Sequence, residues 1–243
     1  MIYINSIDFR EAIKAVIKSA SRDVVELSCV NFNNQGDVFT VMASSNTGFS
    51  IFRVMNQDTL KLWQGAFSKS ISIADAKALL KNLKGLNTKV SIAFRDSEIS
   101  FDFDDHENSY AVLETSFPRL NQLYPNTFRT NFEFDRVSFL KTLKSLKNNI
   151  APEVEMKRVH VEVADHEIKL FAPDAKTESR VSYLSISGDR QSVTLNVDDL
   201  INILSSVKFD TLTLSMNNKK SPVVISSPQE IFAGVSMPCR DQV

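Results

Sequence analysis

Basic side chains recur at helical spacing in three segments of this 243-residue sequence, and their chemistry suits the binding of phosphate groups. In the first segment they occupy every fourth position, which aligns them along one side of an α-helix. The three sets are Arg10, Lys14, Lys18 and Arg22; Lys77, Lys81 and Lys84; and Arg136, Lys141, Lys144 and Lys147. Lysine and arginine hold nucleic-acid phosphates without reading base sequence, through contacts that weaken with salt. For any one segment alone, a solvated lysine-rich helix face is the simpler interpretation.

The distribution of charge along the chain favours one shared positive surface. The three segments contain 11 of the 28 Lys and Arg residues but only four of the 29 Asp and Glu residues. The whole chain has a formal net charge of −1, so its bulk composition conceals this polarity. A fourth segment with the same apolar pattern carries polar and acidic residues instead, so we expect the positive surface to be interrupted there. Those residues are Asp198, Asp199, Asn202, Ser205 and Ser206, ahead of Lys208.

Catalytic motifs are missing from the sequence: it contains no GxSxG, GxxxxGK[ST], HExxH or CxxC. One acidic cluster could hold a hard metal ion, and it consists of Asp102, Asp104, Asp105, His106 and Glu107. It lacks the turn glycine of a calcium loop and lies between a predicted strand ending at Phe103 and one starting near Tyr110. A solvated hairpin connection is therefore preferred, and His160 and His166 are likewise interpreted as surface residues. We expect no enzyme activity, metal site or cofactor.

Composition indicates a globular protein of two domains, because 43% of the residues are hydrophobic and single cores usually divide at this length. Cys29 and Cys239 lie far apart without metal-ligand spacing, and the first residues do not resemble a signal peptide. No apolar run is long enough to span a membrane. These features predict a cytoplasmic protein with reduced thiols and no membrane partner.

Four repeats position the basic segments. In each, a short alternating strand leads to an aspartate, then an amphipathic helix, then more alternating strands. The aspartates are Asp8, Asp75, Asp135 and Asp198, and carboxylates at a helix start accept from free backbone N–H groups. The first helix is predicted to extend to about Arg22. Later strands are predicted at 89–94, 97–103, 159–164, 167–172 and 211–216. Each repeat is therefore β-α-β-β-β, in an α+β fold with antiparallel sheets.

The repeats pair into two similar domains. Residues 71–80 (ISIADAKALL) align with residues 195–204 (LNVDDLINIL), and VSIAF aligns with LTLSM at nearly the same offset. The predicted domains are residues 1–120 and 129–243. Their junction falls in residues 115–130, where Pro118 and Pro125 restrict the chain.

This pattern resembles the sliding-clamp (DNA clamp) fold, whose antiparallel sheets lie outside and whose helices line the inner face. Three segments are similar to the bacterial DNA polymerase III beta clamp. Residues 221–240 (SPVVISSPQEIFAGVSMPCR) resemble that family's ending in Met-Pro-x-Arg, and residues 117–125 (FPRLNQLYP) resemble its linker between the second and third domains. Residues 21–45 resemble the opening strands of its second domain, although Ala43, Ser44, Ser45 and Asn46 replace the usual Ala-Thr-Asp-Gly turn.

The resemblance implies a processivity factor that encircles double-stranded DNA without sequence specificity. It further implies a hydrophobic pocket that binds short linear peptides of a DNA polymerase and a clamp loader. The residues carried over to that pocket are Leu27, Phe49, Pro118, Leu123, Pro222, Val235, Met237, Pro238, Cys239 and Arg240. Met and Pro make an adaptable apolar surface, and Arg240 can grip a carbonyl or carboxylate. Without the resemblance, Leu27, Leu123 and Val235 would be interpreted as core residues.

The family has three domains per subunit, and this chain resembles the last two. A shortened two-domain form would need three copies for a six-domain ring, so a homotrimer is expected, with a phage or mobile element as the source. Two alternatives stay open. One is a ring-less adaptor or decoy that binds clamp-interacting peptides, and the other is a metal-dependent nuclease using residues 102–107.

Overall fold

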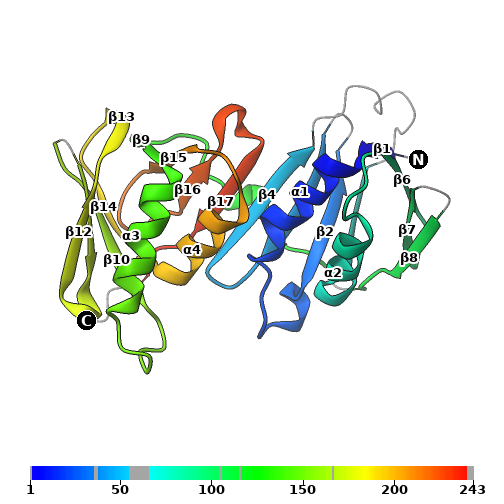
Figure 1. The fold of residues 1–243 in the computed structure, drawn as a ribbon, viewed down its shortest axis with the longest axis horizontal. Helices are drawn as coiled ribbons and strands as arrows, with labels where there is room; N and C mark the ends of the chain where they lie inside the picture. The colour runs from blue at the N-terminus through cyan, green and yellow to red at the C-terminus, as the bar shows by residue number, and fades with distance from the viewer. Residues whose placement is uncertain are drawn as a thin grey trace. The chain divides into compact units, whose positions relative to one another are not determined.

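The computed structural model describes residues 2–35, 38–54, 66–103, 106–114, 116–165 and 167–239. The chain divides into two compact units, Met1–Pro118 and Arg119–Val243, each with its own helices and sheets (Figure 1). None of the helices in these ranges is long and apolar enough to cross a membrane.

The first unit contains two β-α-β-β-β repeats that exchange their first strands. Strand β1 of the first repeat pairs with β6 of the second, which gives the antiparallel order β1-β6-β7-β8. Strand β5 pairs in return with β2, which gives the order β4-β3-β2-β5. The elements are β1 (Ile2–Asn5), α1 (Ser6–Ile17), η1 (Val25–Leu27), β2 (Cys29–Asn34), β3 (Phe39–Ser44), β4 (Gly48–Val54), β5 (Phe67–Ser72), α2 (Ile73–Asn82), β6 (Lys89–Phe94), β7 (Glu98–Phe103) and β8 (His106–Ala111).

The second unit repeats this plan with one added strand, β13, beside β9. Its antiparallel orders are β12-β11-β10-β14 and β13-β9-β15-β16-β17. The elements are η2 (Leu120–Gln122), β9 (Thr130–Asp135), α3 (Arg136–Asn148), β10 (Arg158–Val163), β11 (Ile168–Ala172), η3 (Pro173–Ala175), β12 (Thr177–Val181), β13 (Tyr183–Gly188), β14 (Ser192–Asn196), α4 (Val197–Ser206), β15 (Thr211–Met216), β16 (Val223–Ser226), η4 (Pro228–Glu230) and β17 (Phe232–Ser236). The predicted antiparallel α+β fold of four repeats is confirmed.

Polar side chains start all four helices, but an aspartate caps only one of them. Asp135 accepts from the Ser138 N–H of α3 at 2.7 Å. Hydrogen bonding from the Ser138 side chain, and then from this N–H, holds the pKa of Asp135 below its usual value. The other caps are Asn5, Ser72 and Asn196, and the predicted Asp8, Asp75 and Asp198 lie in the first turns that follow. There a carboxylate complements the helix dipole without capping the helix.

The predicted extension of the first helix to Arg22 is wrong, because α1 ends at Ile17. The Ser21 N–H donates to the carbonyls of Ser44, at the end of β3, and Leu27, at the end of η1. The chain is therefore drawn out of the helix toward a strand, and Arg22 lies exposed beyond the helix.

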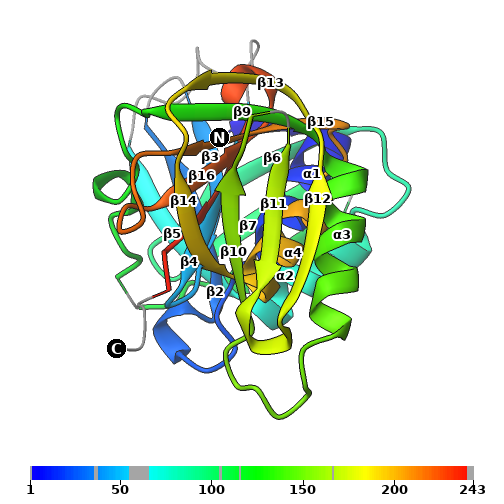
Figure 2. The same cartoon turned by 90° about the vertical axis from the view of Figure 1, so that its left-hand side faces the viewer.

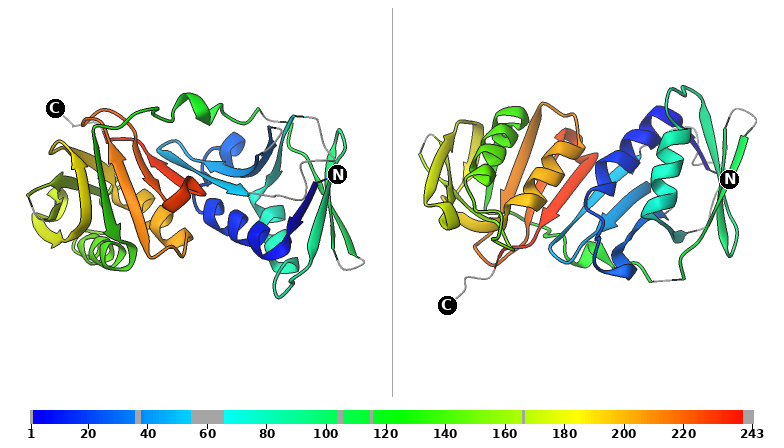
Figure 3. Two further views of the ribbon diagram at one scale, coloured as in Figure 1. Left: turned by 90° about the horizontal axis from the view of Figure 1, so that it is seen from above. Right: turned by 60° about the horizontal axis from the view of Figure 1, so that its bottom comes forward.

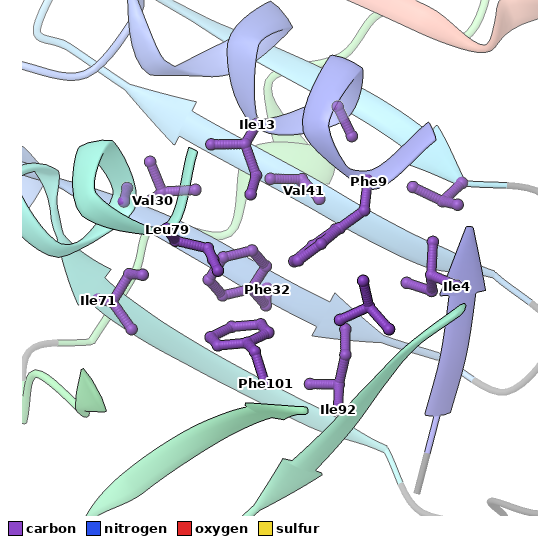
Figure 4. Close-up of a cluster of buried hydrophobic side chains, with 14 of the residues drawn as sticks. Ile4, Phe9, Ile13, Val30, Phe32, Val41, Ile71, Leu79, Ile92 and Phe101 are labelled. Carbon is purple, nitrogen blue, oxygen red and sulfur yellow. The ribbon is translucent and has the colours of Figure 1, made fainter. Parts of the chain in front are cut away.

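The core of the first unit joins its helices to both of its sheets. Phe9 of α1 lies between two strands, with ring centroids 5.8 Å from Phe32 of β2 and 5.5 Å from Phe101 of β7 (Figure 4). Leu79 of α2 joins the same cluster. Burying these apolar groups fixes one face of each helix inward, so the basic residues lie on the remaining faces, where those of α2 are exposed and those of α1 are half-buried.

The helices of each unit lie in pairs. Helix α1 contacts α2, and α3 contacts α4 (Figure 3). Helix α3 also packs along the β12 side of the sheet β12-β11-β10-β14 (Figure 2). Its Phe139 has a ring centroid 4.5 Å from that of Phe134 in β9.

Candidate nucleic-acid and peptide-binding surfaces

Five lysines form the exposed basic faces of α2 and α3. In α2 the buried residues are Ala76 and Leu79, and in α3 they are Phe139, Leu143 and Leu146, which turns the intervening lysines outward. The five are Lys77 and Lys81 in α2, Lys84 just after it, and Lys141 and Lys144 in α3. Within the described ranges none of these side chains makes a hydrogen bond or ion pair. They are available to an external anion.

Three other predicted contacts are already engaged inside the chain. Lys14 forms an ion pair with Glu11 at 2.9 Å, and Lys147 forms one with Asp198 of α4. Arg136 donates from Nε to the Phe209 carbonyl at 2.6 Å and from Nη1 to the Leu204 carbonyl at 3.4 Å. The second bond satisfies a carbonyl in the last turn of α4, so Arg136 has a structural role as a cap.

Arg10 differs from these three basic residues in its hydrogen bonding. It lies half-buried on α1, and its Nε is enclosed without a hydrogen-bond partner in the part of the chain that the structure describes. A buried N–H donor without an acceptor destabilises the fold, so a ligand oxygen that accepted a hydrogen bond from Arg10 Nε would remove this free-energy penalty. Lys18 caps the end of α1 and is exposed, and Arg22 lies beyond it. Of the four basic residues predicted to line one side of this helix, Arg10 and Lys14 therefore lie within it, Lys18 lies at its end and Arg22 lies beyond it.

In the second unit, most of the predicted pocket residues lie in β17 or directly beside β16 and β17. Val235 is fully buried in β17, and Met237, Pro238 and Cys239 follow this strand as half-buried residues. Because Val223 pairs with Ser236, the antiparallel register brings Pro222 alongside Met237. The Cys239 N–H donates to the Thr194 carbonyl of β14 at 2.8 Å, so this segment lies along the β14 edge of its sheet.

The remaining pocket residues differ in exposure. Leu123, after η2, is 45% exposed and can offer apolar surface to a ligand. In the first unit Leu27 and Pro118 are half-buried, whereas Phe49 of β4 is buried. Because they are buried, Phe49 and Val235 can support a binding surface from beneath but offer almost no surface of their own to a ligand. Arg240 lies outside the described residues.

A polar network beside Cys239 was missed in the sequence, because its members come from four separate segments. Arg158 of β10 forms an ion pair with Asp174 of η3 at 2.6 Å, and His160 Nδ1 lies 3.2 Å from Thr194 Oγ1. Burial raises the pKa of the Cys239 thiol, and the nearby Asp199 carboxylate raises it further. This cysteine is therefore protonated and weakly reactive at neutral pH.

The Arg158–Asp174 pair makes stability depend on pH. The hydrogen bond from Arg158 holds the pKa of Asp174 below its ordinary 3.8, against the opposing effect of burial. A lowered carboxyl pKa stabilises the fold above the ordinary value, and this contribution is lost as pH falls through the folded-state pKa. We expect Asp174→Asn to lower the free energy of unfolding by about 1 to 2 kcal/mol at pH 7, and by less at a pH below the ordinary carboxyl pKa, near pH 3.

Urea denaturation of both proteins at the two pH values measures this difference. Glu162→Gln is a matched control, because Glu162 forms only a 4.0 Å surface ion pair with Lys169. Such pairs contribute about 0 to 1 kcal/mol. An equal effect of Asp174→Asn at pH 7 and pH 3 would contradict the assignment.

Three residues of the acidic cluster, Asp102, His106 and Glu107, lie in the described ranges, and within those ranges no group of three potential metal ligands converges. Strand β8 begins at His106, so the predicted start near Tyr110 is wrong, and His106 and Glu107 are strand residues. Glu107 pairs with Asp102 across the β7–β8 ladder and lies 3.8 Å from Arg95. Asp104, Asp105 and His166 lie outside the described residues.

Comparison with known proteins gives matches among solved structures only; no family model and no curated protein matches the sequence. The Pseudomonas aeruginosa DNA polymerase III subunit beta superposes with a TM-score of 0.89 at 15% identity, covering 98% of this chain and 65% of that one. The Bacillus subtilis DNA polymerase sliding clamp gives 0.88 at 15%, covering 98% and 64%. The Streptococcus pyogenes DNA polymerase beta subunit gives 0.86 at 18%, covering 98% and 65%.

The chain spans 64 to 65% of the length of these three clamps. At such low identity the likeness concerns the fold, and it extends over both units and all four repeats. The resemblance drawn from the linker and the C-terminal motif is confirmed at that level. This chain has the fold of the bacterial DNA polymerase III beta sliding clamps.

Proposed function

We propose that the chain is a DNA sliding clamp, a non-enzymatic processivity factor that encircles duplex DNA and tethers a polymerase to it. The observation that carries the proposal is the set of exposed lysines on α2 and α3, displayed by a fold shared with bacterial clamps at TM-scores of 0.86 to 0.89. Their flexible ammonium groups can follow phosphates of any sequence. Arg10 would add a more rigid contact from α1.

A topological test separates encirclement from ordinary binding. The protein is incubated with nicked circular DNA and a bacterial clamp loader, separated from free protein by gel filtration, and the DNA is then linearised. A closed ring held by topology slides off the new ends, so we expect the bound fraction to fall steeply on linearisation. Retention that survives the cut would overturn the sliding mechanism.

Ring closure requires two different and complementary edges, since a head-to-tail contact closes only when its rotation divides the circle. Strands β8 and β12 end the sheets β1-β6-β7-β8 and β12-β11-β10-β14; β8 carries Glu107, and β12 carries Glu178 and Arg180. At the other end of the second sheet, the Cys239 N–H already bonds to β14. We place the contact between β8 of one copy and β12 of the next, in a homotrimer.

Concentration-dependent hydrogen exchange tests this contact. Amides at an open strand edge exchange readily, and pairing with another strand protects them. We expect peptides covering β8 and β12 to become protected as the protein concentration rises, while β13, another edge strand, keeps its exchange rate. Equal protection of all three strands would argue against the assignment. Light scattering over the same range should approach three times the 27.3 kDa chain mass.

The peptide pocket would lie around Met237, Pro238 and Leu123, three pocket residues of the second unit that combine an apolar side chain with accessible surface. A solved Pseudomonas aeruginosa clamp is bound to griselimycin, at 14% identity to this chain, and this compound serves as a probe. We expect Met237→Ala to weaken griselimycin binding about tenfold, the loss of roughly 1.4 kcal/mol of apolar contact.

Calorimetric titration measures that difference. Met156→Ala is the matched control, because Met156 is 46% exposed outside the proposed pocket. Equal binding by both variants would place the probe elsewhere, and no binding by the parent protein would remove the pocket from the proposal.

A ring-less adaptor or decoy for clamp-binding peptides is the second candidate. The observation favouring it is that the chain covers only 64 to 66% of the clamps it resembles. It predicts a monomer or dimer at micromolar concentration, with griselimycin binding intact and no retention on circular DNA. Light scattering distinguishes it from the trimer.

A further inference from the structure

We infer that Glu11 and Asp198 set the strength of DNA binding, because each forms an ion pair with a lysine that would otherwise contact phosphate. This inference rests on the proposed DNA clamp function and deepens it. Both acids lie on the helices of the candidate surface, Glu11 on α1 and Asp198 in the first turn of α4.

The two ion pairs have different origins. Glu11 and Lys14 are three residues apart on one helix, and their side chains are 30% and 32% exposed. Asp198 reaches Lys147 across the α3–α4 contact, with 44% and 36% exposure. Water therefore screens both pairs only in part.

Helix termini favour the second pair. Asp198 lies at the start of α4, where the positive end of the helix dipole stabilises a carboxylate. Lys147 lies in the last turn of α3, where the negative end stabilises an ammonium group. Each charge is therefore favoured where it stands, and their contact draws Lys147 toward α4.

The lysines of these helices therefore differ in how readily they can bind a phosphate. Lys144 stands one turn before Lys147 on α3 and makes no hydrogen bond or ion pair within the described ranges. A phosphate can bind Lys144 directly, but at Lys147 or Lys14 it must compete with a carboxylate that also repels it. Alpha4 itself contains no basic residue. The contacts of a sliding protein must stay weak, and these two acids weaken them.

Equilibrium binding to a DNA duplex tests the inference. Fluorescence anisotropy at several salt concentrations would be measured for the parent, Glu11→Gln, Asp198→Asn and the double variant. We expect each single variant to bind about three- to tenfold more tightly and to steepen the slope of log K against log salt by about 1, since one more contact releases counterions. Thermal denaturation checks that each variant is folded.

Two comparisons make the result specific. Glu162→Gln makes the same charge change on β10, outside the helices, and should leave the affinity unchanged. Lys147→Gln should reduce affinity little in the parent protein but should cancel the gain in the Asp198→Asn background, as a double-mutant cycle requires for a coupled pair. Equal gains from Glu162→Gln would reflect net charge alone and overturn the inference.

Failure of the inference can be told apart from failure of the proposed function. If the parent binds duplex and Lys144→Gln weakens it, while Glu11→Gln and Asp198→Asn change nothing, the two acids have no such role. If the parent does not bind duplex and Lys144→Gln has no effect, the clamp function and this inference fall together.

Discussion

Replacing Lys77, Lys81, Lys141 and Lys144 together with glutamine is expected to lower the affinity for duplex DNA about 100-fold at moderate salt. All four are exposed and make no hydrogen bond or ion pair within the described ranges. Each phosphate contact adds about 0.9 to the slope of log K against log salt, so four lost contacts should flatten that slope by 3 to 4. The variant should therefore resemble the parent protein at high salt.

The matched control removes the same charge from other exposed positions: Lys89, Lys176, Lys219 and Lys220, all outside the four α-helices. We expect the control variant to keep a slope within about 1 of the parent and to lose little affinity. Anisotropy titrations at four salt concentrations measure both quantities. A control that loses as much as the helix variant would show that net charge, and not the helix surface, governs binding.

The repeated fold was predictable because its signals are local. A helix period of 3.6 followed by a strand period of 2 can be read within each segment, and the predicted strands 89–94 and 211–216 coincide with β6 and β15. The errors arose from hydrogen-bond pairing between segments, which the pattern within one segment does not report. Helix α1 stops at Ile17 because the Ser21 backbone bonds to Ser44, and β8 begins at a polar His106 because it pairs with Phe103 of β7.

The candidate DNA surface was predictable in its residue types but not in its partners. Helical spacing places Lys144 and Lys147 on one side of α3. Among the residues that the structure describes, only Lys147 of the two meets an acid, and that acid is 51 residues away on α4. Arg136 bonds to carbonyls 68 and 73 residues away. Which basic side chains remain available is therefore decided by helix–helix packing, which no local pattern reports.

Gly188→Ala is expected to be the most destabilising small substitution that we propose, at about 3 to 5 kcal/mol. Gly188 ends β13 with φ at +94°, and a Cβ added there would lie 1.7 Å from the Arg129 carbonyl oxygen. The neighbouring backbone cannot move away easily, because the Arg129 N–H is bonded to both Met216 and Asn217. The substitution therefore has to separate the end of β13 from β9.

Gly85→Ala isolates the conformational part of this cost. Gly85 has a similar φ of +85°, but an added Cβ there meets nothing within 4 Å, so only the left-handed backbone is penalised, by about 1 kcal/mol. Urea denaturation of the three proteins measures both losses, and hydrogen exchange should locate the first in β13 and β9. If Gly188→Ala costs no more than Gly85→Ala, the close approach of Gly188 to Arg129 does not constrain the fold. If it costs several times more, this contact fixes where β13 ends, because only a residue without a side chain fits against the start of β9.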